Sequence, residues 1–358
     1  MAESSDFSPG RGRGLVLACA LVALAAFPAS ALEVRIYDVA IVVDIVRPKF
    51  QEIIDGFKSV VDARLERDGA RAEYRIYDTK TNPATVPAIL DALRARKPDL
   101  VFVVNSPDAF ADRNVSLKLT DPSYRIVSEN CIPVQSGVAK EWTRPGGNIT
   151  GVGVFVQMTS LIKLAKLINP GYRKLVLYGW DRMKDINAWF LADLTAACRA
   201  EGIELAEVKW VASAEDEFEL YLRLDKLGPE CFGIEAISAW VHRDGSYADM
   251  SAELPGFIRK NVKRFATFAY DEAAMREIAP AGTCVEWKDL GAQLGEKALR
   301  VLGGAKPGDI SWDYPRKYNI VLNVAAAKSL GLTVPPSIIS AAYRVYTDFD
   351  GNFVGRKD

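Results

Sequence analysis

Several polar and aromatic residues of this chain stand directly after short apolar runs, at positions that suit ligand binding. In open parallel sheets, ligands lie beyond the carboxyl ends of the strands. The candidates in the first half of the chain are Asp44, Arg47, Ser106, Asp108 and Glu129. Those in the second half are Trp180, Trp240, Tyr270 and Asp271. Acidic acceptors together with flat rings suit a small molecule that has a polar head and an aromatic or cationic part.

Ser106 has the most specific chemistry among these candidates. It precedes Pro107 and a predicted helix, so its hydroxyl and the free N–H groups of the first turn can hold a carboxylate or carbonyl oxygen. A plain N-cap is the alternative, and the two roles are compatible. Asp44 and Asp271 also stand directly before helical patterns, where capping is the alternative to ligand binding.

Three of the seven tryptophans, Trp180, Trp240 and Trp287, follow predicted strands in the second half of the chain. Together they predict an apolar wall that stacks on a ring or a cation of the ligand. Packing in the core beneath the loops is the alternative for each of them.

The sequence has no pattern that is typical of catalysis. Its single histidine, His242, lies in a charged turn, and neither a Gly-x-Ser-x-Gly motif nor a phosphate loop occurs. No His or Cys spacing suits a metal site. We therefore expect a protein that is not an enzyme and that carries no cofactor.

Length and charge narrow the class further. The chain has 358 residues, with 45 Lys and Arg against 46 Asp and Glu. The length is sufficient for two lobes, and the balanced charge does not suit a nucleic-acid partner. We expect a monomer whose ligand is a small molecule.

The N-terminus predicts export. Arg11 and Arg13 precede an apolar run from Leu15 to Phe27, and Ala29-Ser-Ala31 follows as a small-residue cleavage site. The run is too short to span a bilayer as a helix. We expect cleavage after Ala31 and a periplasmic location, with an uncleaved anchor as the alternative.

Four cysteines remain after removal of the predicted signal peptide: Cys131, Cys198, Cys231 and Cys284. An exported chain allows disulfides, and four cysteines permit three pairings. Buried free thiols are the alternative.

Apolar runs alternate with amphipathic patterns along the chain, and this alternation defines the fold class. The predicted strands lie at 34–43, 74–77, 100–104 and 125–128, and then at 174–178, 204–211, 232–237, 264–268 and 284–286. Helical patterns lie between several of them, and this alternation implies parallel sheets with right-handed crossovers. In the helix predicted over 247–260, Pro255 is expected to cause a kink or a break.

Two motifs resemble those of a bacterial family. They are Arg144-Pro-Gly-Gly-Asn-Ile-Thr-Gly151 and Asn323-Val-Ala-Ala-Ala-Lys-Ser-Leu-Gly-Leu-Thr-Val-Pro-Pro-Ser337. The chain resembles the ABC-transporter substrate-binding proteins of the type that includes tryptophan and tyrosine binders. A looser match joins Asn82-Pro-Ala-Thr85 with Lys97-Pro-Asp-Leu-Val101. The resemblance implies two Rossmann-like lobes with parallel sheets joined by a multi-strand hinge, as in the periplasmic binding protein type I fold, and it supports Ser106-Pro107 as part of the cleft.

In proteins of this kind the chain crosses the hinge three times, and we place the crossings near residues 143–150, 286–290 and 308–318. The expected domains are a signal peptide (1–31), an N-terminal lobe (32–145 plus 288–310), a C-terminal lobe (146–287 plus 311–342) and a tail (343–358). The expected function is closure on an amino acid or related amine or aromatic ligand and its delivery to an ABC permease. A membrane sensor as partner, a sugar as ligand, and an enzyme on the same architecture are the alternatives.

Overall fold

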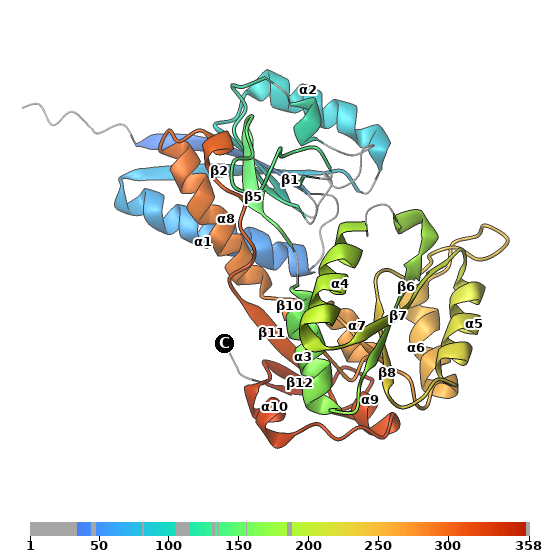
Figure 1. Cartoon of the computed structure of the whole chain (residues 1–358). Coiled ribbons are helices and arrows are strands. Elements are labelled where there is room, and N and C mark those ends of the chain that lie inside the picture. The colour runs from blue at the N-terminus through green and yellow to red at the C-terminus, as the bar shows by residue number, and fades with distance from the viewer. Residues whose placement is uncertain are drawn as a thin grey trace, which may run out of the picture. The chain divides into compact units, whose positions relative to one another are not determined.

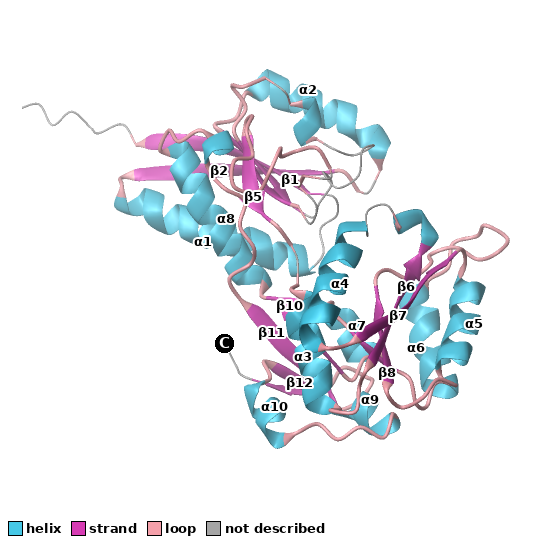
Figure 2. Ribbon diagram, in the orientation of Figure 1, coloured by secondary structure: helices cyan, strands magenta, loops and turns pink. Residues whose placement is uncertain are grey.

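The structure is a computed structural model that describes residues 34–43, 48–80, 82–104, 115–119, 121–130, 133–134, 136–154, 156–184 and 188–355. Helices and strands alternate along the chain (Figures 1 and 2). They form three sheets, of which the first two are fully parallel.

The first sheet has five strands in the order β2-β1-β3-β4-β5. These are β1 (Arg35–Val43), β2 (Ala70–Asp78), β3 (Leu100–Val104), β4 (Ile126–Glu129) and β5 (Ile149–Val152). The β-branched run of β1 is buried on both faces, as expected for a central parallel strand. One face packs against α1 (Pro48–Arg67) and α8 (Trp287–Leu302), and the other packs against α2 (Val86–Arg96).

The second sheet has four strands in the order β7-β6-β8-β9. These are β6 (Lys174–Trp180), β7 (Glu204–Val211), β8 (Cys231–Glu235) and β9 (Ala266–Phe268). One face packs against α3 (Met158–Ile168) and α4 (Ala188–Glu201). The other face packs against α5 (Ala214–Leu224) and α6 (Met250–Asn261).

A third sheet continues from the second. It contains β10 (Ala281–Val285), β11 (Tyr318–Asn323), β12 (Arg344–Tyr346) and β13 (Phe353–Gly355) in that order. A parallel bridge between Ala269 and Gly282 joins it to the end of β9. The short helices α7 (Glu272–Glu277), α9 (Val324–Ser329) and α10 (Pro336–Ala341) connect these strands. Single-turn 3₁₀ helices lie at Pro83–Thr85, Ser116–Lys118, Asp181–Met183 and Pro307–Asp309.

The predicted fold class, two α/β units with parallel sheets, is confirmed. Three details differ from expectation. The junction stretch supplies β5 of the first sheet, which a domain boundary at residue 146 did not include. The sequence patterns did not indicate α5. The residues expected to form a separate tail supply β12 and β13 of the third sheet.

Of the two outcomes expected at Pro255, a kink or a break, the break is wrong, because α6 runs through this residue. Proline removes the hydrogen bond to the carbonyl four residues earlier. That carbonyl belongs to Ser251, which is exposed, so water can satisfy it. Pro255 itself is buried in the core and gains apolar contacts there.

Helices α1 and α8 approach each other closely enough for their backbones to touch. A Cβ atom on Gly56 would lie 2.0 Å from the carbonyl oxygen of Lys288, and one on Gly291 would lie 2.0 Å from that of Ile53. At Gly295 the corresponding distance to the carbonyl oxygen of Phe57 is 2.9 Å. Glycine at these positions therefore permits a helix contact that no side chain could enter.

Replacing Gly291 by Ala is expected to destabilise the protein. The added methyl group would overlap the backbone of Ile53, and such overpacking costs about 1–3 kcal/mol. The free energy of unfolding in urea measures the effect.

Gly256 provides a matched control, since it lies in α6 and a Cβ atom there would meet nothing within 4 Å. Gly256→Ala should stabilise the protein by about 0.5–1 kcal/mol, because alanine is the better helix former. A Gly291→Ala variant that is as stable as Gly256→Ala would show that the two helices can separate without cost.

Candidate functional site

The carboxyl ends of three strands meet in the second sheet. β6, β8 and β9 run parallel, so their ends lie at one edge. The backbone N–H of Trp180 donates to the carbonyl of Ile237 (2.7 Å), and the hydroxyl of Tyr270 donates to the carbonyl of Ala236. The segment that follows β8, residues 236–240 and here named the β8 loop, therefore contacts the ends of both neighbouring strands.

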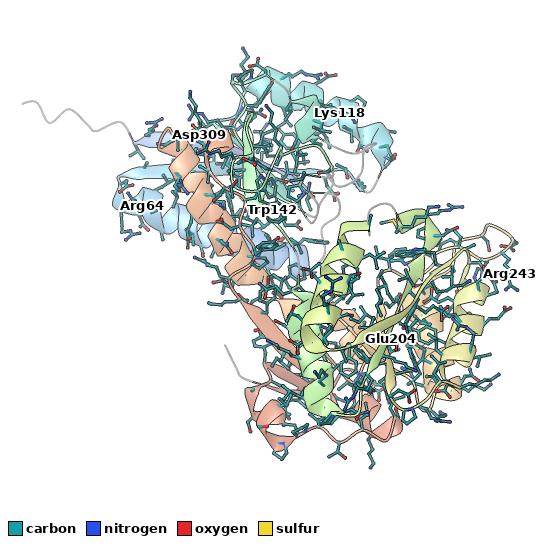
Figure 3. All side chains as sticks on the ribbon, viewed as in Figure 1. Arg64, Lys118, Trp142, Glu204, Arg243 and Asp309 are labelled. Carbon is teal, nitrogen blue, oxygen red and sulfur yellow. The ribbon has the colours of Figure 1, made fainter. Side chains whose placement is uncertain are left out.

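Trp240 is the last residue of the β8 loop and is 42% exposed. Its ring packs edge-on against Tyr247, with centroids 6.4 Å apart. The chain returns through a turn at residues 241–247. Arg243, labelled in Figure 3, belongs to this turn. It anchors the turn on α5 by pairing with Asp216 (2.6 Å) and Glu219 (2.8 Å). The exposed indole of Trp240 is thus held on a fixed support.

Trp180 has a different environment. It continues the row of Val176 and Tyr178 and packs against the core beneath α5 and α6. The guanidinium of Arg182 lies 5.4 Å from the centre of its ring. Trp287 packs against a different buried cluster. Trp180 and Trp287 thus pack against different clusters, so core packing, the alternative that the sequence left open for each tryptophan, is present for these two.

Two further candidates of the second unit follow β9. Tyr270 lies beside Phe190, with ring centroids 5.6 Å apart. Asp271 caps α7, since its carboxylate accepts the backbone N–H of Ala273 (2.9 Å). Capping, the alternative that the sequence left open for Asp271, is thus present, and a cap remains compatible with ligand binding through the second oxygen.

In the first sheet, the structure describes one of the five predicted site residues. Glu129 ends β4 and is buried. The next residue, Asn130, is also buried; its backbone N–H donates to Val152 (3.2 Å) and its side chain to Ser136 (3.1 Å). Asp44, Arg47, Ser106 and Asp108 lie outside the described residues.

A buried polar network lies beneath the β8 loop, and the sequence analysis did not find it. We name it the acid cluster; it consists of Tyr178, Glu217, Tyr221, Glu235 and Ser238. Tyr178 donates to the hydroxyl of Tyr221 (2.9 Å), which donates to Glu235 (3.0 Å). Ser238 donates to the other oxygen of Glu235. Glu217 accepts the backbone N–H of Ala239 (2.8 Å).

Burial governs the protonation of the acid cluster. It raises the pKa of Glu217 well above the ordinary value, and the neighbouring Glu235 raises it further. Burial also raises the pKa of Glu235. The missed signals were Glu235, an acidic residue at the end of an apolar strand, and the spacing of Glu217 and Tyr221 on one face of α5.

Other candidate chemistry is structural in the described part of the chain. The thiols of Cys198, Cys231 and Cys284 are free and buried, and burial raises the pKa of Cys198 to about 11. Cys131 lies outside the described residues. His242 binds Glu215 (2.9 Å) in its charged turn. Over the described ranges no group of His, Cys, Asp and Glu side chains could hold a metal ion, and none of their helices is both long and apolar enough to cross a membrane.

Comparisons with known proteins give a consistent result. The family described as ABC transporter substrate binding protein matches residues 38–346. The tyrosine-binding protein of Clostridioides difficile (strain R20291) is 21% identical over 287 residues, which are 80% of this chain and 78% of that protein.

Two solved structures share the fold. The ABC domain from Streptococcus pneumonia in complex with L-Trp has a TM-score of 0.66 at 18% identity, over 86% of this chain and 99% of that one. The ligand-free, open structure of a substrate binding protein with adhesive properties from Clostridium difficile has a TM-score of 0.66 at 18% identity, over 84% and 96%.

Proposed function

This chain belongs to the ABC transporter substrate-binding protein family, and we propose that it binds an amino acid or a related aromatic amine and delivers it to an ABC permease. The observation that carries the proposal is the meeting of three strand ends around the β8 loop, where Trp240 is exposed and Tyr270 is positioned. The names of two relatives, a tyrosine-binding protein and a domain in complex with L-Trp, support the same ligand class.

The proposed site lies in a cleft between two lobes. We assign residues 32–145 with 288–310 to one lobe and 146–287 with 311–342 to the other, and move β5 to the first because it pairs with β4. Asp44, Arg47, Ser106, Asp108 and Glu129 would face the ligand from the first lobe. Trp180, Trp240, Tyr270 and Asp271 would border it from the second.

The proposed roles follow from the chemistry of each side chain. The ring of Trp240 and the ring of Tyr270 hold the flat or cationic part of the ligand. Ser106 and the helix terminus behind it hold a carboxylate. Glu129 is an acidic residue at the carboxyl end of β4, and it would accept a hydrogen bond from an amine.

Delivery to a permease requires the protein to be outside the cytoplasm. We propose that residues 1–31 are a cleaved signal peptide and that the mature protein acts in the periplasm as a monomer. Substrate binding without turnover is the expected activity.

A thermal-shift screen of amino acids, amines, aromatics and sugars tests the ligand class. L-tryptophan, L-tyrosine or a related amine is expected to raise the melting temperature, because ligand at 100 times its dissociation constant stabilises the folded state by about 2.7 kcal/mol. A shift with a sugar and with no amine would contradict the proposed class and support the sugar alternative.

Binding is expected to close the two lobes, since ligand contacts from both sides exist only in the closed state. Small-angle scattering should give a smaller radius of gyration at saturating ligand than without ligand. A radius that does not change at saturation would contradict closure.

Trp240→Ala is expected to weaken binding of the ligand found in the screen by about 1–3 kcal/mol, the range for a desolvated stacking or cation–π contact. Titration calorimetry measures the change. Trp240 is a cleaner target than Trp180, which packs in the core.

Phe353→Ala is the matched control, because Phe353 is also an exposed aromatic residue (52%) but lies on β13. It should bind with the affinity of the parent. Equal affinities of parent, Trp240→Ala and Phe353→Ala would remove Trp240 from the site.

A further inference from the structure

The β8 loop is held by hydrogen bonds to several elements. Ala239 donates its backbone N–H to Glu217 on α5 (2.8 Å), and Ser238 donates its hydroxyl to Glu235 at the end of β8. The carbonyls of Ala236 and Ile237 accept from Tyr270 and Trp180. Two carboxyl groups thus hold the half of the loop that leads into Trp240.

These two carboxyl groups have no cationic partner among the described residues. The groups that face them are the hydroxyls of Tyr178 on β6, Tyr221 on α5 and Ser238 in the loop itself. Thr267 on β9 extends the network through Tyr178 (2.6 Å). Two adjacent carboxylates without a cation would be strongly unfavourable in such a site.

The environment of Glu217 indicates how two adjacent buried carboxyl groups can be accommodated without a cation. Its side chain is fully buried, and within the described residues its Oε1 atom has no donor. An ionised oxygen in that position would lack any compensation. A proton on Oε1 would make that oxygen a donor, and we infer that its acceptor is the neighbouring carboxyl group of Glu235, whose charge raises the pKa of Glu217.

We propose that Glu217 and Glu235 share one proton and that this proton positions the β8 loop, and with it Trp240, for ligand binding. The role in binding rests on the proposed function, whereas the role in holding the loop does not. The two glutamates are positioning residues and need not touch the ligand.

The raised pKa values set the direction of the pH dependence. A glutamate has an ordinary pKa of 4.5, and that of Glu217 lies well above it because of burial and of Glu235. The pair releases its two protons in two macroscopic steps, and the contribution of the last, shared proton is lost as the pH rises through the higher of the two raised pKa values. Beyond that point both groups are ionised and repel each other, and this repulsion acts on the two carboxyl groups that accept hydrogen bonds from the loop.

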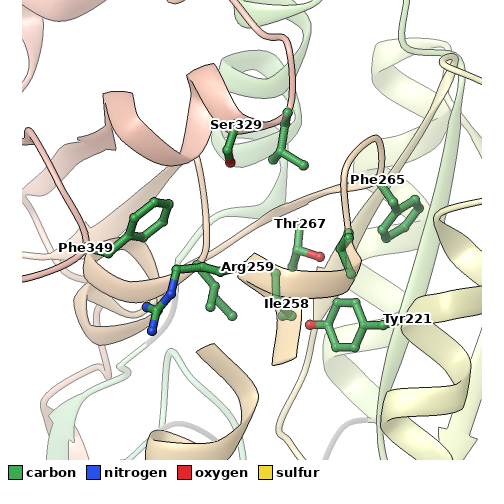
Figure 4. A pocket seen from close by; sticks show the side chains of 10 residues that line it. Tyr221, Ile258, Arg259, Phe265, Thr267, Ser329 and Phe349 are labelled. Atoms are coloured by element: carbon green, nitrogen blue, oxygen red, sulfur yellow. The ribbon is translucent and has the colours of Figure 1, made fainter. Parts of the chain in front are cut away.

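A small cavity lies beside the hydroxyl groups of this network. Tyr221 and Thr267 line it together with Ile258, Arg259 and Phe265 (Figure 4). Its volume is about 20 Å³, which is room for about one water molecule. Arg259 is the charged group that α6 contributes to this lining. Water in the cavity can reach the hydroxyl of Tyr221, which is bonded to Glu235.

The variant Glu217→Gln tests the effect of titration separately from the effect of the hydrogen bonds. The amide can still donate to Glu235 and accept from Ala239, but it does not titrate. The first measurement is amide hydrogen exchange of residues 236–240 in ligand-free protein from pH 5 to 9, expressed as protection factors. In the parent, protection is expected to fall by about tenfold as the pair loses its proton, the effect of one lost hydrogen bond to a charged group. In Glu217→Gln it should stay high and independent of pH.

Two further variants complete the design. Glu235→Gln removes the second titrating group and should also give a flat profile. Glu219→Gln changes an exposed carboxyl on the same helix and should keep the profile of the parent. Circular dichroism confirms folding of each variant.

The second measurement is titration calorimetry with L-tryptophan at the same pH values. The affinity of the parent should fall with its loop protection, and that of Glu217→Gln should not. Protection factors that are independent of pH in the parent, or equally dependent in parent and Glu217→Gln, would overturn the proposal. A titrating loop in a protein that binds neither L-tryptophan nor any ligand of the screen would leave the shared proton in place and overturn the proposed function instead.

Discussion

The backbone contact between α1 and α8 is the constraint on which the rest of the architecture depends. It joins a helix from the beginning of the described chain to one from its last quarter, and glycines at the crossing allow the two backbones to meet. Together the two helices cover one apolar face of the first sheet. All residues between β5 and α8 are therefore inserted between a sheet and the helix that completes it.

The junction of the two units shows why its glycine-rich motif has that composition. A Cβ atom on Gly151 would lie 1.8 Å from the carbonyl oxygen of Ser128 and 2.7 Å from the ring of Trp312. Gly153 donates its N–H to Asp313 (2.8 Å), and the buried Lys297 of α8 pairs with the carboxylate of Asp313 (2.6 Å). The outgoing and returning segments thus share hydrogen bonds, and the motif leaves room for the chain that crosses beside it.

Much of the fold could be predicted because its signals are local. The apolar runs of β3 and β7 fall at the predicted residues. Helix α5 was missed because acidic residues fill its first turn, so a core-facing pattern is visible only once Glu217 is recognised as buried.

The candidate site could be predicted less completely than the fold, for a physical reason. Strand-end positions follow from local patterns, but which side chains turn toward the core depends on alternation along each strand, as for Trp180. In β6, Trp180 and Tyr178 are two residues apart, so alternation puts their side chains on the same face of the sheet. The acid cluster is formed by residues of α5, β6 and β8 together. No local sequence pattern predicts that glutamates from two separate elements will lie in the same buried space.

The first sheet and the helix α8 that covers it are separated in the sequence, and this separation has a consequence for folding during synthesis. A nascent chain that has reached β5 contains every strand of that sheet but lacks α8. Its apolar surface, including Ile53 and Phe57 of α1, stays uncovered until residue 302 has emerged. The third sheet needs still later residues, up to Gly355 of β13. The first unit therefore cannot complete its core before α8 has been made, and the third sheet needs a still longer chain, so both must wait until most of the polypeptide has been synthesised.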